Sequence, residues 1–139
     1  MPVIKYDYLA RPHLDNGKLV AIYRPIISIR LGGNHKIYPH TINCLVDSGA
    51  DFNLFPAHFG ESFGLNIKKG KKVTHIGIGD VGITAYEHPV KLYLTNYHFN
   101  TTAHFSYDHK IPLLGRYSFF SFFKKVTFDQ DKLMLTLQY

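Results

Sequence analysis

Strand-forming residues in this chain occur in short runs, and each run is bounded by glycine, proline or asparagine. β-Branched and aromatic side chains favour the pleated surface of a sheet, whereas the bounding residues favour turns. The runs that the pattern predicts as strands or strand pairs are residues 19–31, 37–47, 53–56, 71–94, 97–107, 111–115 and 124–138. Only residues 57–65 and 116–123 favour a turn or two of helix. We therefore expect an all-β domain, built as a small barrel or a sandwich.

The length and composition of the chain indicate one globular domain. It has 139 residues, of which 45% are apolar, 15% aromatic and 19% charged. A chain of this length can bury roughly two-thirds of its unfolded surface, so its core needs no disulfide or structural metal. The single cysteine, Cys44, can form neither an internal disulfide nor, by itself, a thiolate zinc site.

The sequence shows no targeting or membrane signal. Its first residues carry charges at Lys5, Asp7 and Arg11, and they lack the apolar core of a signal peptide. No run of about 20 apolar residues is present that could span a bilayer. We therefore expect a soluble protein of the cytoplasm, without a membrane partner.

The basic character of the chain does not by itself indicate a nucleic-acid partner. The formal net charge is +6, and the densest basic patch consists of Lys68, Lys69, Lys71 and Lys72 around Gly70. A nucleic-acid surface combines a basic face with a docking element or with stacking aromatic residues. These lysines instead separate two elements, so we expect a solvated turn and no nucleic-acid partner.

Motifs for phosphates, cofactors and metals are weak or lack the right context. The residues GIGDVG, 77–82, satisfy a dinucleotide-binding pattern, but they lie inside a hairpin pattern and not between a strand and a helix. The nine histidines are scattered, and the nearest cluster, His98, His104 and His109, lacks a carboxylate or thiol at ligand spacing. We expect surface or hydrogen-bonded histidines, no metal and no cofactor.

The segment NCLVDSGADFNLFP, residues 43–56, directs one carboxylate toward the interior. Asp47 directly follows an apolar strand, and Gly49 comes two residues later. An Asp-Ser-Gly sequence is also compatible with a simple turn, in which the aspartate accepts a backbone N–H. Burial of a charge without a partner is costly, however, so Asp47 is the principal candidate for a chemical role.

Two later features add to this one. The residues IPLLGR, 111–116, form a short apolar strand that ends at a glycine followed by an arginine. The residues THIGIGDVGITAY, 74–86, form a hairpin with three glycines at its tip. An inward aspartate on a tight turn, a short apolar strand and a glycine-tipped hairpin are far rarer in combination than separately.

Together these features resemble the retropepsin-like aspartic proteases, which comprise the retroviral proteases and their single-lobed cellular and prokaryotic relatives. LVDSGA, residues 45–50, fits the family's hydrophobic-hydrophobic-Asp-Thr/Ser-Gly-Ala motif, and LLGR, residues 113–116, fits its second motif. IGIGDVG, residues 76–82, takes the place of the family's flap, and residues 116–123 that of its short C-terminal helix. The resemblance implies the retropepsin-like acid protease barrel, with one lobe per chain.

The chain departs from this pattern in three places. Ser48 replaces the commoner threonine, and Asp80 lies in the flap where many members have glycine. Residues 1–19 have no clear counterpart in the short viral enzymes. We therefore divide the chain into an N-terminal extension, residues 1–19, which is a dimer contact or a removable pro-segment, and a protease domain, residues 20–139.

The resemblance implies an aspartic endopeptidase that works without a cofactor. Each chain would supply one catalytic Asp47, and two chains would form a homodimer in which the paired carboxylates activate a water. Ser48 would brace the two loops across the dimer axis. Gly49 would turn its N–H toward the carboxylate, and we expect any Cβ at this position to clash.

The resemblance also implies a polypeptide substrate that is bound in an extended conformation. The residues expected to contact it are Ala50, Asp51, Ile76, Gly77, Ile78, Gly79, Asp80, Val81, Gly82, Ile83 and Leu113. Leu114, Gly115 and Arg116 would support the site, with Arg116 paired to Asp51. The apolar members of this set could instead belong to the core, above all Leu113. The alternative function is a catalytically weak or inactive dimer of the same fold that binds peptides.

Overall fold

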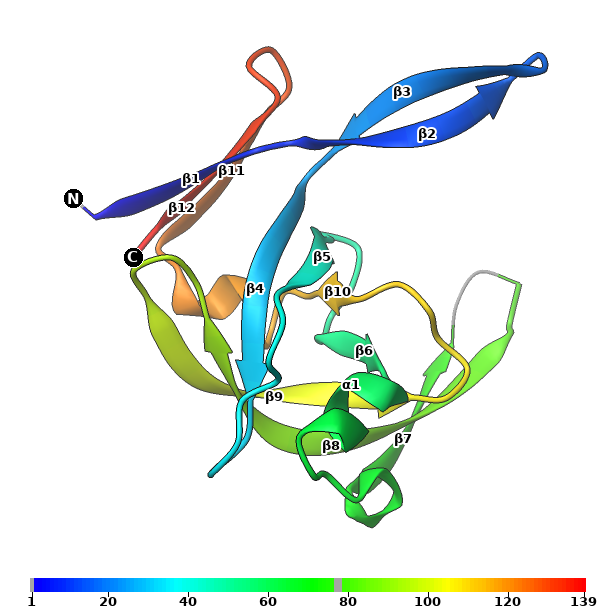
Figure 1. Cartoon of the computed structure of the whole chain (residues 1–139), viewed down its shortest axis with the longest axis vertical. Helices are drawn as coiled ribbons and strands as arrows, with labels where there is room; N and C mark the ends of the chain where they lie inside the picture. Colours follow the sequence, from blue (N-terminus) through cyan, green and yellow to red (C-terminus); the bar gives the residue numbers. More distant parts are fainter. Residues whose placement is uncertain (1, 77–78) are drawn as a thin grey trace.

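A computed structural model of the chain describes residues 2–76 and 79–139 (Figure 1). In chain order its elements are β1 (Val3–Asp7), β2 (Leu9–Asp15), β3 (Lys18–Arg24), β4 (Ile26–Gly32), β5 (Ile42–Val46), β6 (Leu54–Pro56), α1 (Ala57–Ser62), the 3-10 helix η1 (Ile67–Lys69), β7 (Lys71–Ile76), β8 (Gly82–Tyr93), β9 (His98–Ser106), β10 (Leu113–Leu114), the 3-10 helix η2 (Phe120–Phe122), β11 (Lys125–Asp129) and β12 (Met134–Gln138). Strands dominate, so the predicted all-β class is confirmed.

The body of the molecule is a closed sheet. Seven strands follow one another in the order β4-β5-β10-β6-β9-β8-β7, and β4 also pairs with β8. This additional pairing closes six of the strands into a small barrel and leaves β7 on the outside, paired only with β8. Closure removes most of the free strand edges that would otherwise invite aggregation.

The core follows from alternation along the strands. In β4 the side chains of Ile27, Ile29 and Leu31 are buried, whereas Ser28 and Arg30 are exposed. Side chains of successive residues in a strand point to opposite faces, so every second residue enters the barrel. Phenylalanines complete the interior, and Phe55, Phe105 and Phe119 are fully buried.

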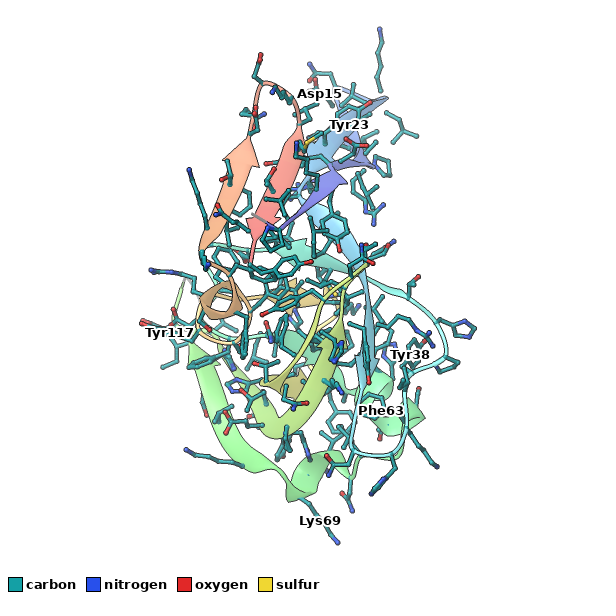
Figure 2. The ribbon with its side chains drawn as sticks, turned by 90° about the vertical axis from the view of Figure 1, so that its left-hand side faces the viewer. Asp15, Tyr23, Tyr38, Phe63, Lys69 and Tyr117 are labelled. Atoms are coloured by element: carbon teal, nitrogen blue, oxygen red, sulfur yellow. The ribbon has the colours of Figure 1, made fainter. Side chains whose placement is uncertain are left out.

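Two smaller sheets lie beside the barrel. β1 and β11 flank β12 in a three-stranded antiparallel sheet that brings the two ends of the chain together. β2 and β3 pair only with each other, and Figure 1 shows their hairpin standing apart from the rest of the molecule. In Figure 2, Asp15 and Tyr23 of this hairpin lie at the opposite end of the molecule from Lys69.

Some element boundaries differ from those predicted. The run 19–31 divides at Pro25 into β3 and β4, and the strand predicted at 37–47 shortens to Ile42–Val46. Residues 2–17 contain β1 and β2, which the sequence pattern did not indicate. Position 19, where the sequence suggested a domain boundary, lies inside β3. Within the described residues, no helix has the length and apolarity needed to cross a membrane.

Candidate active site

Asp47 lies where β5 ends, in a turn that holds its carboxylate. The Gly49 N–H donates a hydrogen bond of 2.8 Å to Asp47 Oδ1, and the Ala50 N–H donates to the Asp47 carbonyl oxygen at 3.1 Å. The side chain is half-buried, while Ser48 and Gly49 are exposed. The turn therefore holds the carboxylate in place at the edge of the barrel, half-buried and not in the interior as the apolar run before it had suggested.

The second motif lies directly beside this turn. β10 pairs in parallel with β5, with Leu114 opposite Val46, and the Asp47 N–H donates to the Leu114 carbonyl oxygen at 3.0 Å. Beyond β10, the Arg116 N–H donates to the Ala50 carbonyl oxygen at 2.8 Å. Residues some 70 positions apart in the chain thus form one backbone network around the aspartate.

Asn53, a buried residue that the sequence analysis did not single out, connects the segment after the Asp47 turn to the second motif. The side chain of Asn53 is fully buried, and its Oδ1 accepts a 3.1 Å hydrogen bond from the Gly115 N–H. Its Nδ2 donates to the carbonyl oxygens of Ser118 at 2.9 Å and Thr102 at 3.0 Å. A buried amide with every polar atom paired holds its neighbours in one arrangement.

Gly115 allows the two loops to approach each other closely. A Cβ at this position would lie 2.6–2.7 Å from the backbone N, C and O atoms of Phe52. Real Cβ atoms do not come so close to a backbone, so only glycine fits. The glycine of the second motif is therefore required by packing against the Asp47 loop.

A cleft of about 600 Å³ opens next to the aspartate turn. Its lining residues are Gly49, Ala50, Asp51, Phe52, Leu54, Lys71, Val73, Thr74, His75, Ile76, Glu87, His104 and Leu113. Four of the residues predicted to contact substrate, Ala50, Asp51, Ile76 and Leu113, therefore share one cavity with Gly49. Leu113 is only half-buried, so it is available to the cleft as well as to the core.

The glycine-rich hairpin forms one wall of this cleft. Ile76 pairs with Gly82 and His75 with Ile83, and the described residues 79–81 lie at the tip beyond these pairs. Gly79 and Asp80 both have positive φ, at 84° and 58°. Aspartate tolerates this left-handed region better than most residues, so Asp80 can occupy a turn position that otherwise favours glycine. Val81 is exposed, and the predicted contacts Gly77 and Ile78 lie outside the described residues.

Three polar side chains in the cleft form a hydrogen-bonded chain. His75 Nε2 lies 2.6 Å from His104 Nδ1, and His104 Nε2 lies 3.5 Å from Glu87 Oε1. An ionised Glu87 can only accept, which assigns the proton of a neutral His104 to Nε2 and leaves its Nδ1 to accept from His75. The ring of Phe52 packs on His104 with a centroid distance of 4.8 Å.

Burial lowers the pKa of both histidines. For His75 the next contribution is repulsion from His109, while Asp51 partly opposes the decrease of its pKa. For His104 the next contribution is repulsion from His75, and the hydrogen bond and charge of Glu87 act against it. Lys71 adds a smaller repulsion. The lowered pKa values favour the neutral form of both histidines at pH 7.

The sequence did not indicate this contact of His75, His104 and Glu87, because the three residues are distant from one another in the chain. His98 and His109, the predicted neighbours of His104, do not form it; His75 and Glu87 do. The contact depends on strand register, since Glu87 pairs with His104 across β8 and β9. No group of three or more His, Cys, Asp or Glu side chains among the described residues could hold a metal ion.

Two expected details of the site are different in the structure. The ion pairs among residues 2–76 and 79–139 do not include Asp51 with Arg116; both side chains are exposed, and the backbones of the two loops carry the contact instead. A Cβ on Gly49 would meet only Asp47 Oδ1, at 3.2 Å, and the φ of Gly49 is not positive. Within one chain, the predicted clash at Gly49 is thus a tight contact and not an exclusion.

Comparison with known proteins finds similarity in structure but not in sequence. No family model matches the sequence, and no curated protein is detectably similar to it. The crystal structure of a retropepsin-like aspartic protease from Rickettsia conorii superposes with a TM-score of 0.66 at 20% identity, over 99% of this chain and 92% of that one. EIAV protease complexed with the inhibitor HBY-793 gives a TM-score of 0.48 at 23% identity, over 67% of this chain and 82% of the viral one.

Proposed function

We propose that this chain, which has the retropepsin-like fold, is one half of an aspartic endopeptidase that becomes active as a homodimer. The observation that carries the proposal is the position of Asp47. Its carboxylate is held by the Gly49 N–H, its backbone is bound to Leu114 of the second motif, and a cleft large enough for a peptide begins at its turn. A pure binding protein would not need a carboxylate fixed in this way.

One carboxylate cannot supply both the base and the acid that peptide hydrolysis requires. A second copy, related by a two-fold axis, would bring its own Asp47 beside the first. Two carboxyl groups at about 3 Å cannot both ionise, so the pair would share one proton. Such a pair titrates as a unit, and the roles of base and acid belong to the dyad and not to either chain.

The reaction would then proceed in two steps. The ionised Asp47 takes a proton from water, the hydroxide attacks the scissile carbonyl carbon, and the protonated partner gives its proton to the carbonyl oxygen. The resulting diol collapses as one hydroxyl returns its proton to the dyad. The leaving nitrogen takes a proton from the dyad, and the C–N bond breaks, leaving a carboxylic acid and an amine.

The substrate would be an extended polypeptide. Ala50, Ile76 and Leu113 offer apolar surface in the cleft, whereas His75 and Asp51 offer polar contacts. Backbone groups of Gly49 and of the glycine-rich hairpin would pair with the peptide as an added strand does. Cleavage between bulky apolar residues is the expected preference.

Substitution of the aspartate tests the catalytic role directly. Asp47→Asn keeps the shape and the hydrogen bond from Gly49, but it removes the ionisable group. We expect the wild-type chain to cleave a denatured protein at acidic or neutral pH and the variant to show no cleavage. Glu61→Gln, the same chemical change on the exposed face of α1, should retain activity. Cleavage by Asp47→Asn at the wild-type rate would contradict the proposal.

A mixing experiment tests whether the site is shared. If dimers form at random, an equal amount of Asp47→Asn added to wild-type chain halves the number of fully competent dimers, so activity falls to about half. The same amount of Glu61→Gln should cause no loss. An undiminished rate in the first mixture would mean that each chain acts alone. Peptide binding without cleavage by the wild-type chain would favour the alternative, a peptide-binding dimer.

A further inference from the structure

The β2–β3 hairpin has one face that consists only of apolar residues. In its antiparallel register Ala10 pairs with Tyr23, Pro12 with Ala21, and Leu14 with Leu19. Side chains of paired residues share a face, so these six residues form one continuous surface, which we call the arm face. It comprises Ala10, Pro12, Leu14, Leu19, Ala21 and Tyr23.

In a chain that works alone, the apolar face of a hairpin should be covered and the charged face exposed, but in this hairpin the apolar face is the exposed one. All six residues of the arm face are exposed, with Leu14 at 65%, Leu19 at 76% and Tyr23 at 50% of their full accessibility. The opposite face carries more charge, yet it is the better covered: Leu9, Arg11 and Ile22 are half-buried. A continuous apolar surface on a free-standing hairpin marks a contact with another molecule.

The hairpin begins directly beside the aspartate turn. The Val46 N–H, one residue before Asp47, donates to the Pro25 carbonyl oxygen at 2.9 Å, and Pro25 is the residue that connects β3 to β4. Seven residues of strand extend about 23 Å from this point. Figure 1 shows the hairpin projecting outward past the end of β5 and away from the barrel.

These positions limit what can cover the arm face. A second copy that brings its Asp47 next to this Asp47 must lie close to Pro25, where the hairpin joins β4. The hairpin, which extends about 23 Å from Pro25, then lies along the surface of the second copy. Arg11 and Arg24, on the opposite face, line a groove with Leu45 and Pro112 of their own chain, so the arm face is turned away from its own barrel.

We infer that the β2–β3 hairpin is a dimerisation arm whose apolar face is buried against a second copy of this chain. The inference takes the identity of the partner from the proposed function, because the aspartate dyad needs two copies. It assigns residues 9–24 to the assembly of the active site and makes activity depend on a segment that contributes no lining residue to the cleft around Asp51.

A pair of double variants tests the arm face. Leu14→Ser with Leu19→Ser places two hydroxyls on it, while His13→Ser with Val20→Ser changes the neighbouring cross-strand pair on the opposite face. Dimerisation is measured by sedimentation equilibrium in the Asp47→Asn background, so that self-cleavage plays no part. We expect the first pair to raise the dimer dissociation constant at least tenfold, and the second to change it less than threefold.

Activity measurements separate the arm from the chemistry. With Asp47 intact, the Leu14→Ser, Leu19→Ser chain should lose cleavage at low concentration and regain it as the concentration rises. Ala21→Lys, a second change to the arm face, should act in the same way if the double variant folds poorly. Equal dissociation constants for both double variants would overturn the inference, even if cleavage still requires Asp47. If the arm variants lose the dimer while the wild-type chain shows no cleavage, the inference of a dimerisation arm holds and the proposed protease activity is contradicted.

Discussion

Replacement of Asn53 by alanine should destabilise the fold and disconnect the two motifs of the site. The side chain makes three hydrogen bonds, to the Gly115 N–H and to the carbonyl oxygens of Ser118 and Thr102. Ser118 retains a second donor, the Thr101 hydroxyl at 2.7 Å, so its carbonyl oxygen remains paired. The Gly115 N–H, which is buried, loses the partner that the asparagine supplied.

The magnitude follows from these contacts. Each hydrogen bond contributes about 1 kcal/mol net, and a buried donor left without a partner costs about 1–3 kcal/mol. The bonds to Ser118 and Thr102 account for about 2 kcal/mol and the unpaired Gly115 N–H for about 1–3 kcal/mol, so the free energy of unfolding should decrease by about 3–5 kcal/mol. For a domain of this size that corresponds to a decrease in Tm of roughly 10–15 °C.

Urea unfolding followed by circular dichroism measures this change. Asn100→Ala is the matched control, because Asn100 is exposed on β9, and it should change the unfolding free energy by less than about 0.5 kcal/mol. Asn53→Asp keeps the shape and the acceptor but cannot donate to the two carbonyl oxygens, so it should be at least as damaging at neutral pH. A loss below about 1 kcal/mol in Asn53→Ala would refute the reasoning.

Two further predictions concern packing and pH. Gly115→Ala should cost at least about 2 kcal/mol, because its Cβ would overlap the Phe52 backbone; Gly82→Ala, whose Cβ has room, serves as the control in thermal unfolding. The pKa values of His75 and His104 are lowered in the folded state, so the unfolded chain takes up protons first as the pH falls below about 6.5. Stability is therefore complete above that pH and decreases below it. The decrease between neutral and acidic pH, measured by urea unfolding, should be smaller in a His75→Gln, His104→Gln double variant; equal slopes would contradict this origin.

Local patterns in the sequence were sufficient for the parts of the site that are contiguous in the chain. The aspartate turn depends on Asp47 and Gly49, two residues apart, and its hydrogen bond is the one that the motif predicts. The glycine-tipped hairpin likewise depends on a short stretch whose strands pair with each other. Turn preferences and strand alternation depend on residues that are close in the chain, so both can be recognised in the sequence before the fold is known.

Contacts between distant strands could not be predicted in this way. The His75–His104 contact depends on the register of three strands, and the burial of Asn53 depends on where β10 enters the sheet. The exposure of the arm face could not be predicted for a related reason. Strand alternation shows which residues share a face, but not whether another part of the chain covers that face.

The order of amino acids thus defined an all-β chain with an aspartate on a braced turn, because strand and turn preferences are properties of neighbouring residues. The assembly of the barrel decided which polar groups line the cleft and which apolar surface of the β2–β3 hairpin stays exposed. It also decided that Asp51 and Arg116 do not form an ion pair. Those outcomes depend on distances between residues far apart in the chain, and only the packed strands set such distances.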